Sequence, residues 1–344
     1  MCIRPMWLFL CVFIWLKVIV VNGQDDHAKS DDNTYILGVM DAHMATLEGW
    51  EAFDVLIRYK TVGNGRRVEE EGLIKGPDAK SVIANQKGLV RLLVDLPGKR
   101  VLIINRIENE TQMFDSLDQE IRKPSRIADD RRLLFDEARN IRLGQRVSGV
   151  PLQLVTLPPI EALLKEFGVP NLKAFGTAGS ADSWHTETLI DTLRYNQQIL
   201  KSVSHVGKDR YQTVLQDRKE IGALTRGFKI YVDWDVNDKV PVKFVSYSET
   251  PDGEFFSRPK TTENVRWARI DGHPVPVSSR RVFSKVRYLV DELRFYIEYD
   301  QSTDLHWFSF NQKLEDTLFS EEILNDPKRV DELMSEQVFQ TSDR

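Results

Sequence analysis

The feature that most constrains the fold of this chain is an alternation of apolar and polar side chains that recurs in two long stretches. In the first, Phe53, Val55 and Ile57 alternate with more polar neighbours, and segments between residues 197 and 310 repeat the pattern. Residues that favour turns return about every 8 to 12 positions. A period of two marks a strand with two different faces, and within each stretch the strands do not alternate with helices. The sequence therefore predicts a meandering antiparallel sheet.

Three more strands are predicted from residues 80–86, 88–96 and 99–107, with turns at Gly88 and at Pro97-Gly98. A turn is also expected where "VGNGR", residues 62–66, interrupts the first alternating segment. In 88–96 and 99–107 both sets of alternate positions are apolar. Strands of this kind are covered on both faces.

Helical periodicity occurs in three places. Residues 34–48 have apolar side chains three or four apart, between a candidate N-cap at Asn33 and a stop at Gly49. The middle of the chain contains "DDRRLLFDEARNIRLG" and "PPIEALLKEFG", which have the composition of helices. Near the end, "DPKRVDELM" offers Asp326 as N-cap and Pro327 at the first helical position. We expect a helical insertion near 108–180 and a helical tail at 312–344.

Residues 1–23 have the layout of a secretory signal peptide, with Arg4 near the start and an apolar run from Met6 to Val21. The alternative is an uncleaved anchor. That run has 16 residues and contains Lys17, whereas roughly 20 apolar residues are needed to span a bilayer. Either interpretation places the rest of the chain in the periplasm or outside the cell. Residues 24–33 are expected to form a disordered, acidic lead-in.

Both cysteines, Cys2 and Cys11, lie in this leader. The mature chain therefore has no thiol for a disulfide, a metal site or a nucleophile. Removing Arg4 and Lys17 with the leader leaves 45 basic against 52 acidic side chains, a net charge of −7. An acidic chain is a poor partner for nucleic acid.

Sequence motifs for a cofactor, a metal or a nucleophile are missing. The histidines lack the spacing of a zinc site, and Ser180 and Ser183 near His185 lack the GxSxG frame. The glycines of "VGNGRR" and "GTAG" lack the frame of a phosphate-binding loop. We therefore predict no cofactor, no metal and no enzymatic activity.

The acidic cluster in "YVDWDVNDKV" permits three interpretations: a calcium loop, a catalytic pair of carboxylates, or the tip of a hairpin. Asp233, Asp235 and Asn237 fit the first positions of an EF-hand loop, but Asp238 replaces its glycine and Phe244 its final glutamate. Strand alternation surrounds the cluster. The pattern therefore favours a hairpin with "VNDK" as its turn.

The order of these segments is similar to that of a known family. A leading helix is followed by "RLLVDLPGKRVLIIN", a helical middle, "IYVDWDVNDKVPVKFVSY", "WARIDGHPVPVS" and a closing "FSFN". Over about residues 34–311 this series resembles the outer-membrane lipoprotein carrier superfamily (LolA- and LolB-like proteins). The resemblance implies an α+β fold in which a curved antiparallel sheet, an incomplete β-barrel, wraps around helices. It also implies an apolar concave surface that holds acyl chains.

The concave face of such a sheet supplies the candidate ligand-binding residues. Its apolar side must be buried on helices or on an apolar guest. A buried acyl chain gains about 0.8 kcal/mol for each methylene. The candidates are Phe53, Val55, Ile57, Val90, Leu92, Ile230, Val232, Trp234, Leu293, Phe295 and Ile297.

Three functions remain open at this point. The first is an exported, non-enzymatic carrier or sensor that binds a lipid-like or acylated ligand, and it requires a continuous apolar cavity. The second is a cell-envelope module that binds a partner protein, with a filled core and an exposed apolar patch. The third is a secreted hydrolase, which requires two acids that meet in a polar cleft. Abundant Asp and Glu alone favour the third.

Overall fold

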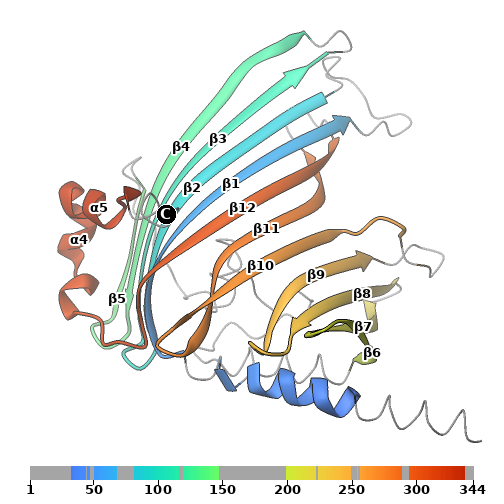
Figure 1. Ribbon diagram of the computed structural model, residues 1–344. Coiled ribbons are helices and arrows are strands. Elements are labelled where there is room, and N and C mark those ends of the chain that lie inside the picture. Colours follow the sequence, from blue (N-terminus) through green and yellow to red (C-terminus); the bar gives the residue numbers. More distant parts are fainter. Residues whose placement is uncertain are drawn as a thin grey trace, which may run out of the picture.

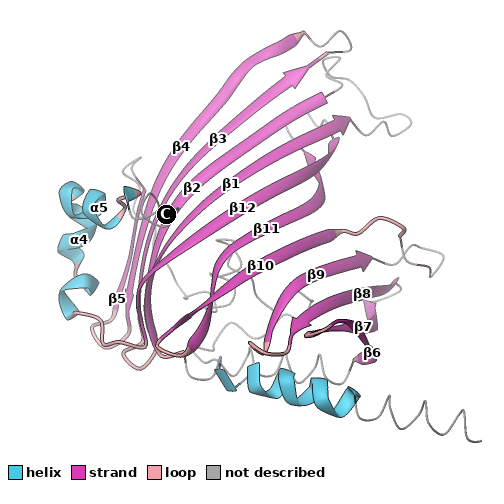
Figure 2. Ribbon diagram, in the orientation of Figure 1, coloured by secondary structure: helices cyan, strands magenta, loops and turns pink. Residues whose placement is uncertain are grey.

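The computed structural model describes residues 32–43, 45–46, 50–67, 81–115, 119–146, 199–221, 224–248, 254, 256–288 and 294–337. Most of them belong to one 12-stranded antiparallel sheet (Figures 1 and 2). The strand order is β5-β4-β3-β2-β1-β12-β11-β10-β9-β8-β7-β6, so β1 joins β12 and every other neighbour is consecutive in sequence. The prediction of a meandering antiparallel sheet is confirmed.

The strands alternate in direction along the whole sheet. Their bounds are β1 Ala52–Arg67, β2 Ser81–Asp95, β3 Arg100–Phe114, β4 Glu120–Asp136, β5 Ile141–Arg146, β6 Leu200–Gly207, β7 Arg210–Ile221, β8 Leu224–Asp235, β9 Val240–Ser248, β10 Thr261–Ile270, β11 His273–Tyr288 and β12 Arg294–Phe310.

The long strands bend, so the sheet has a concave face and an outer, convex face (Figure 1). The N-terminal helix, residues 32–43, lies at one end of the concave side and contacts β7, β8 and β10 through side chains. The C-terminal segment packs on the outer face. It contains η2 (Asp316–Phe319), α4 (Glu321–Asn325) and α5 (Pro327–Leu333).

The predicted α+β fold, an incomplete β-barrel wrapped around helices, is wrong. Strands make up most of the described chain and the helices are short (Figure 2). The sheet is open, because β5 and β6 lie at its opposite edges. The helices η2, α4 and α5 lie against the outer face rather than inside the curve.

The expected helical insertion near 108–180 is also wrong within the described residues, because β4 and β5 occupy 120–136 and 141–146. The physical reason is that apolar layers lie on both faces of the sheet at this point. Leu134 joins the outer layer and Leu133 the concave one. A strand delivers consecutive apolar residues to both layers, whereas a helix would present them to one. The segment 158–168 lies outside the described residues.

Three glycines that the sequence predicts to mark turns lie inside strands. Gly88 lies inside β2, and Gly63 and Gly65 lie inside β1, so the turns expected there are wrong. A Cβ at Gly88 would lie 2.3 Å from Cζ of Tyr59, and one at Gly63 would lie 2.6 Å from Cε1 of Tyr299. These glycines therefore leave room for tyrosine rings to lie flat across the neighbouring strand.

Two turns are confirmed. Residues 96–99 connect β2 to β3, and residues 236–239 connect β8 to β9. Lys99 and Lys239 complete these turns with φ of 50° and 56°. The C-terminal helix is confirmed as well, because the Asp326 side chain accepts hydrogen bonds from the backbone N–H groups of Lys328 and Arg329.

Two apolar layers hold the sheet in place. The concave core unites β1–β3 and β12 with β8–β10 and with Ile36, Val39 and Met40 of the N-terminal helix. The outer core joins β1–β4 to the C-terminal segment through Phe319, Ile323 and other side chains. The prediction that β2 and β3 are covered on both faces is confirmed.

A seam divides the sheet between β9 and β10. Their pairing runs only from Thr261 to Asn264, opposite Ser246 to Lys243, whereas β1 and β12 pair from Phe53 to Arg67. Beyond the seam ladder the two strands diverge (Figure 1). The Trp267 indole N–H donates to the Pro241 carbonyl at 2.7 Å and connects them again.

Candidate functional site

Most of the predicted site residues lie together on the concave face. Phe53, Val55, Ile57, Val90, Leu92, Ile230, Val232 and Trp234 are buried members of the concave core. Phe295 and Ile297 belong to a second cluster on the same face. Leu293 lies outside the described residues.

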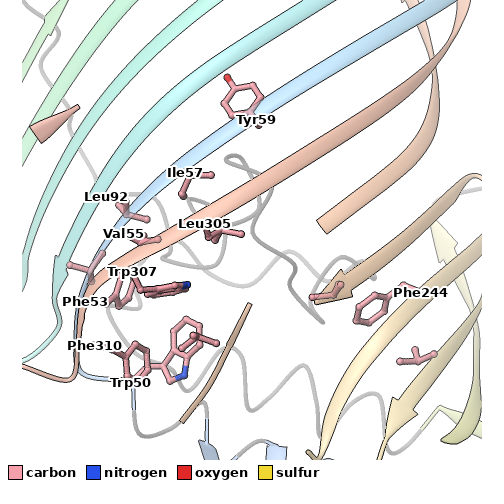
Figure 3. Close-up of a cluster of buried hydrophobic side chains, with 14 of the residues drawn as sticks. Trp50, Phe53, Val55, Ile57, Tyr59, Leu92, Phe244, Leu305, Trp307 and Phe310 are labelled. Carbon is pink, nitrogen blue, oxygen red and sulfur yellow. The ribbon is translucent and has the colours of Figure 1, made fainter. Parts of the chain in front are cut away.

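The concave core is densely packed at the end near the N-terminal helix. The rings of Trp50, Phe53, Trp307 and Phe310 contact one another edge-on, with centroids 5.3–5.8 Å apart (Figure 3). The Trp307 indole N–H donates to the Pro276 carbonyl at 2.8 Å. These aromatic side chains fill this end of the curve, so the residues here act as core.

The second cluster, here called the upper apolar cluster, lies farther along the same strands. Among the described residues its members come from strands: Val82, Met113, Phe295, Ile297 and Tyr299, with Ala84 and Phe283 against them. It adjoins Gly63 and Gly65, whose missing side chains admit Tyr299 and Ile297. The concave face therefore has two apolar zones, of which the first is packed on the N-terminal helix.

A polar array separates these zones on β1, β12 and β11. Thr61 and Thr303 are 4% and 1% exposed, and neither hydroxyl has a hydrogen-bond partner. The buried Nε of Arg281 also has none. Sequence reasoning missed these residues. The available signal was a polar side chain at concave positions of β1 and β12, Thr61 and Thr303, next to the apolar residues Tyr59 and Leu305 on the same face.

The acidic cluster forms the predicted hairpin of β8 and β9. Its carboxylates point to different partners. Asp233 accepts a hydrogen bond from the Gln212 side chain at 2.7 Å, Asp238 pairs with Arg269 at 3.2 Å, and Asp235 accepts from two N–H groups of its own turn. Among the described residues, no group of three or more His, Cys, Asp or Glu is placed to hold a metal ion.

His43 of the N-terminal helix lies at the seam. It is 2% exposed, and its ring meets the rings of Trp234 on β8 and Trp267 on β10 edge-on, at 5.9 and 5.6 Å between centroids. Burial lowers the pKa of His43 from 6.5 to about 4, and a hydrogen bond to the Lys239 backbone opposes that shift. The imidazole is therefore neutral at pH 7.

This burial predicts a loss of stability in acid. Between pH 6.5 and about 4 the unfolded chain protonates His43 and the folded chain does not. The contribution of His43 is therefore complete above pH 6.5 and falls as the pH decreases toward 4, by about 3 kcal/mol in all. Urea unfolding at pH 7 and pH 4.5 measures it. His43→Leu should show a smaller decrease than the native chain, and equal decreases would contradict the prediction.

A buried ion pair lies on the outer face beneath α5. Arg91 contacts Asp54 at 2.6 Å (Nε to Oδ1) and donates a hydrogen bond to its Oδ2 at 2.7 Å. The guanidinium also lies 3.4 Å from the centre of the Phe308 ring. Burial raises the pKa of Asp54 while Arg91 opposes that shift, and burial lowers the pKa of Arg91. Since Arg91 lies on the outer face, it takes no part in the concave site.

Two adjoining grooves run along the outer face beside the end of the C-terminal segment, with volumes of about 690 and 700 Å³. Apolar Val62, Ile83 and Leu89 contribute to their lining. The charged lining is paired, as in Lys87 with Glu108 at 2.8 Å and Arg106 with Asp331 at 2.6 Å. The grooves are therefore mixed surfaces without an excess of either charge.

Comparisons with known proteins do not assign this chain to a family. No family model matches the chain, and no curated protein matches it significantly. An outer membrane channel from Pseudomonas putida F1 has 12% identity over 74% of this chain and 96% of its own, with a TM-score of 0.26. A β-barrel-like protein from Brucella abortus has 10% identity over 74% and 98%, with a TM-score of 0.19. Such scores do not establish a shared fold.

Within the described ranges, none of the helices has the length and apolar character that a bilayer crossing requires.

Proposed function

We propose that this chain is an exported, non-enzymatic protein that binds a lipid-like or other hydrophobic ligand on the concave face of its sheet. The observation that supports the proposal is the upper apolar cluster, to which only strands contribute among the described residues. The concave core, in contrast, is completed by the N-terminal helix. The side chains of the upper apolar cluster are buried, with Phe295 and Ile297 0% exposed, and no described helix contributes to the cluster, so this interior part of the curve is best suited to an apolar ligand.

The ligand class follows from the shape of that zone. From Phe295 to Gln301 the concave positions of β12 extend over seven residues, which correspond to about 20 Å of strand. Burying apolar surface there gains about 25 cal/mol for each Å². A long acyl chain matches such an apolar strip. In the finer form of the proposal, implied by the resemblance to the lipoprotein carriers, the cargo is an acylated protein or lipid.

Native mass spectrometry of the mature protein, purified without detergent, tests the proposal. We expect bound or readily taken up fatty-acyl molecules, and an intact mass that corresponds to a chain beginning after residue 23. Ile297→Ser, in the upper apolar cluster, should reduce uptake of the fluorescent probe N-phenyl-1-naphthylamine. Tyr296→Ser is the matched control, because Tyr296 is the neighbour on the other face and is 48% exposed.

The outcome against the proposal is equally specific. A ligand-free mass, together with no probe uptake by the native chain, would contradict it. If Ile297→Ser does not fold, the measurements on the native chain still decide.

A second candidate function is a cell-envelope module that binds a partner protein. The observation that favours it is the pair of adjoining grooves on the outer face, with apolar and charged linings side by side. Substitution of Ile83 by Glu should then weaken capture of the partner without changing probe uptake. This second function predicts a filled concave interior.

A further inference from the structure

We propose that the concave face holds its ligand by an acceptor oxygen at the head of an acyl chain, a carboxylate or an ester carbonyl, through Thr61, Thr303 and Arg281. This inference rests on the proposed function and adds the chemistry of the head group. It is carried by three buried polar atoms, the two hydroxyl oxygens and Nε of Arg281, that have no hydrogen-bond partner.

Strand register brings the three side chains together. Thr303 lies opposite Tyr59 on β1, and Thr61 lies opposite Gln301 on β12, so the two threonines are diagonal neighbours on one face. Arg281 lies opposite Gln301, and is therefore diagonal to Thr303 from the other side. Diagonal neighbours are about 7–8 Å apart. A small head group near Thr303 is within reach of all three.

Burial makes the missing partners significant. Thr61 and Thr303 are 4% and 1% exposed, and nearly all buried polar groups in folded proteins have a partner. Trp234 and Trp307 of the concave core follow that rule, because their indole N–H groups donate to the Thr213 hydroxyl at 3.0 Å and to the Pro276 carbonyl at 2.8 Å, whereas Nε1 of Trp50 has no partner. Two adjacent exceptions on one face therefore indicate a partner that comes from outside the chain.

The donor and acceptor properties of the three groups select the head group. The Arg281 Nε–H can only donate a hydrogen bond, and each threonine hydroxyl can donate one as well. An oxygen with free lone pairs satisfies all three groups. An alkyl ammonium head, which has donors alone, leaves the arginine unsatisfied and adds a like charge beside it.

The charges around Thr61, Thr303 and Arg281 are compatible with two kinds of acceptor oxygen. Glu263, 7% exposed, lies opposite Arg281 on β10. An arginine and a glutamate side by side carry no net charge, so a neutral ester carbonyl and a carboxylate both fit. The shared requirement is the acceptor oxygen.

The acyl chain has an apolar path from this head. The concave positions that follow Gln301 along β12 are Tyr299, Ile297 and Phe295, all members of the upper apolar cluster. On β11 the next concave position after Arg281 is Phe283, whose ring lies 4.9 Å from the guanidinium carbon. The array therefore stands at one end of the apolar strip, as a head-group site requires.

Competition against N-phenyl-1-naphthylamine in the full mature chain tests the inference. The competitors are laurate, methyl laurate and dodecylamine, which share a chain length and differ in the head. The variants are Thr61→Val/Thr303→Val, which keeps side-chain volume, and Arg281→Gln. Ser302→Ala is the matched control, because Ser302 is exposed and lies between two concave positions of β12.

We expect laurate or methyl laurate to bind at least about tenfold more tightly than dodecylamine, and the threonine double variant to lose about tenfold for the favoured competitor. Its affinity for the probe and its melting temperature should stay at the native level. A larger effect of Arg281→Gln on laurate identifies the carboxylate as the source, and equal effects identify the ester.

Two results would overturn the inference alone. One is native affinity for laurate and methyl laurate in the threonine double variant. The other is a lower melting temperature of that variant, because the hydroxyls would then have partners in the folded chain. A native protein that takes up neither the probe nor any competitor contradicts the proposed function itself.

Discussion

Replacing Asp54 by alanine is expected to lower the free energy of unfolding by about 3–5 kcal/mol. The side chains of Asp54 and Arg91 are 9% and 5% exposed, and the variant would leave the guanidinium buried without its counter-ion. Phe308 and the Leu333 carbonyl, 3.4 Å from Nη1, cannot replace a carboxylate. Urea unfolding at pH 7 measures the loss.

Two controls make this prediction specific. The double variant Asp54→Leu/Arg91→Met removes both charges, and it should recover most of the lost stability, because well-packed apolar residues often replace a buried pair without cost. Asp304→Ala breaks the Arg58–Asp304 pair, whose side chains are 40% and 49% exposed. It should cost less than about 1 kcal/mol. Equal losses for Asp54→Ala and Asp304→Ala would contradict a buried role.

Replacing Trp234 by alanine is expected to cost about 3–5 kcal/mol, as truncations of large buried aromatic residues do. Trp234 is 1% exposed, donates to Thr213 and lies against His43 of the N-terminal helix. The variant therefore leaves a cavity, removes the hydrogen bond that the Thr213 hydroxyl accepts, and removes the ring contact between His43 and β8.

Chemical denaturation and far-ultraviolet circular dichroism together measure this effect. Trp234→Phe fills part of the cavity and should lose less stability than the alanine variant. Tyr296→Ala is the surface control, since Tyr296 is 48% exposed. A loss below about 1 kcal/mol for Trp234→Ala would show that the N-terminal helix does not depend on this contact.

Local chemistry made the sheet and several turns predictable from sequence. Alternation in β1 placed Phe53 and Val55 on one face, and Pro97-Gly98 and "VNDK" marked turns where the chain reverses. The end of the C-terminal segment was predictable for the same reason, because the Asp326 cap acts within one helical turn.

The wrong predictions concern residues whose conformation depends on contacts with strands that are distant in the sequence. Sequence alone indicates a turn at Gly88, because the Tyr59 ring that packs against this glycine comes from another strand. Leu133 and Leu134 read as helical until apolar layers on both faces of the sheet are known. Such contacts join positions far apart in the sequence, so no local pattern carries them.

The candidate site was predictable only in part. Alternation located the concave positions, but it could not distinguish Phe53, which packs in an aromatic cluster, from Ile297, whose described cluster neighbours are all strand residues. That difference depends on which part of the sheet the N-terminal helix packs against. The unpartnered state of Thr61 and Thr303 depends on the geometry of neighbouring side chains and is invisible in a single sequence.

The short ladder between β9 and β10 has a mechanical consequence. The strands β6–β9 on one side of the seam, and β10–β12 with β1–β5 on the other, are joined by this short ladder, by the Trp267–Pro241 hydrogen bond, by the rings around His43 and by the concave core. Separation of these two groups of strands along the seam would widen the concave side and leave the strand pairing within each group intact. Under the proposed function, bending at this seam would let ligands of different width bind without disrupting either group of strands.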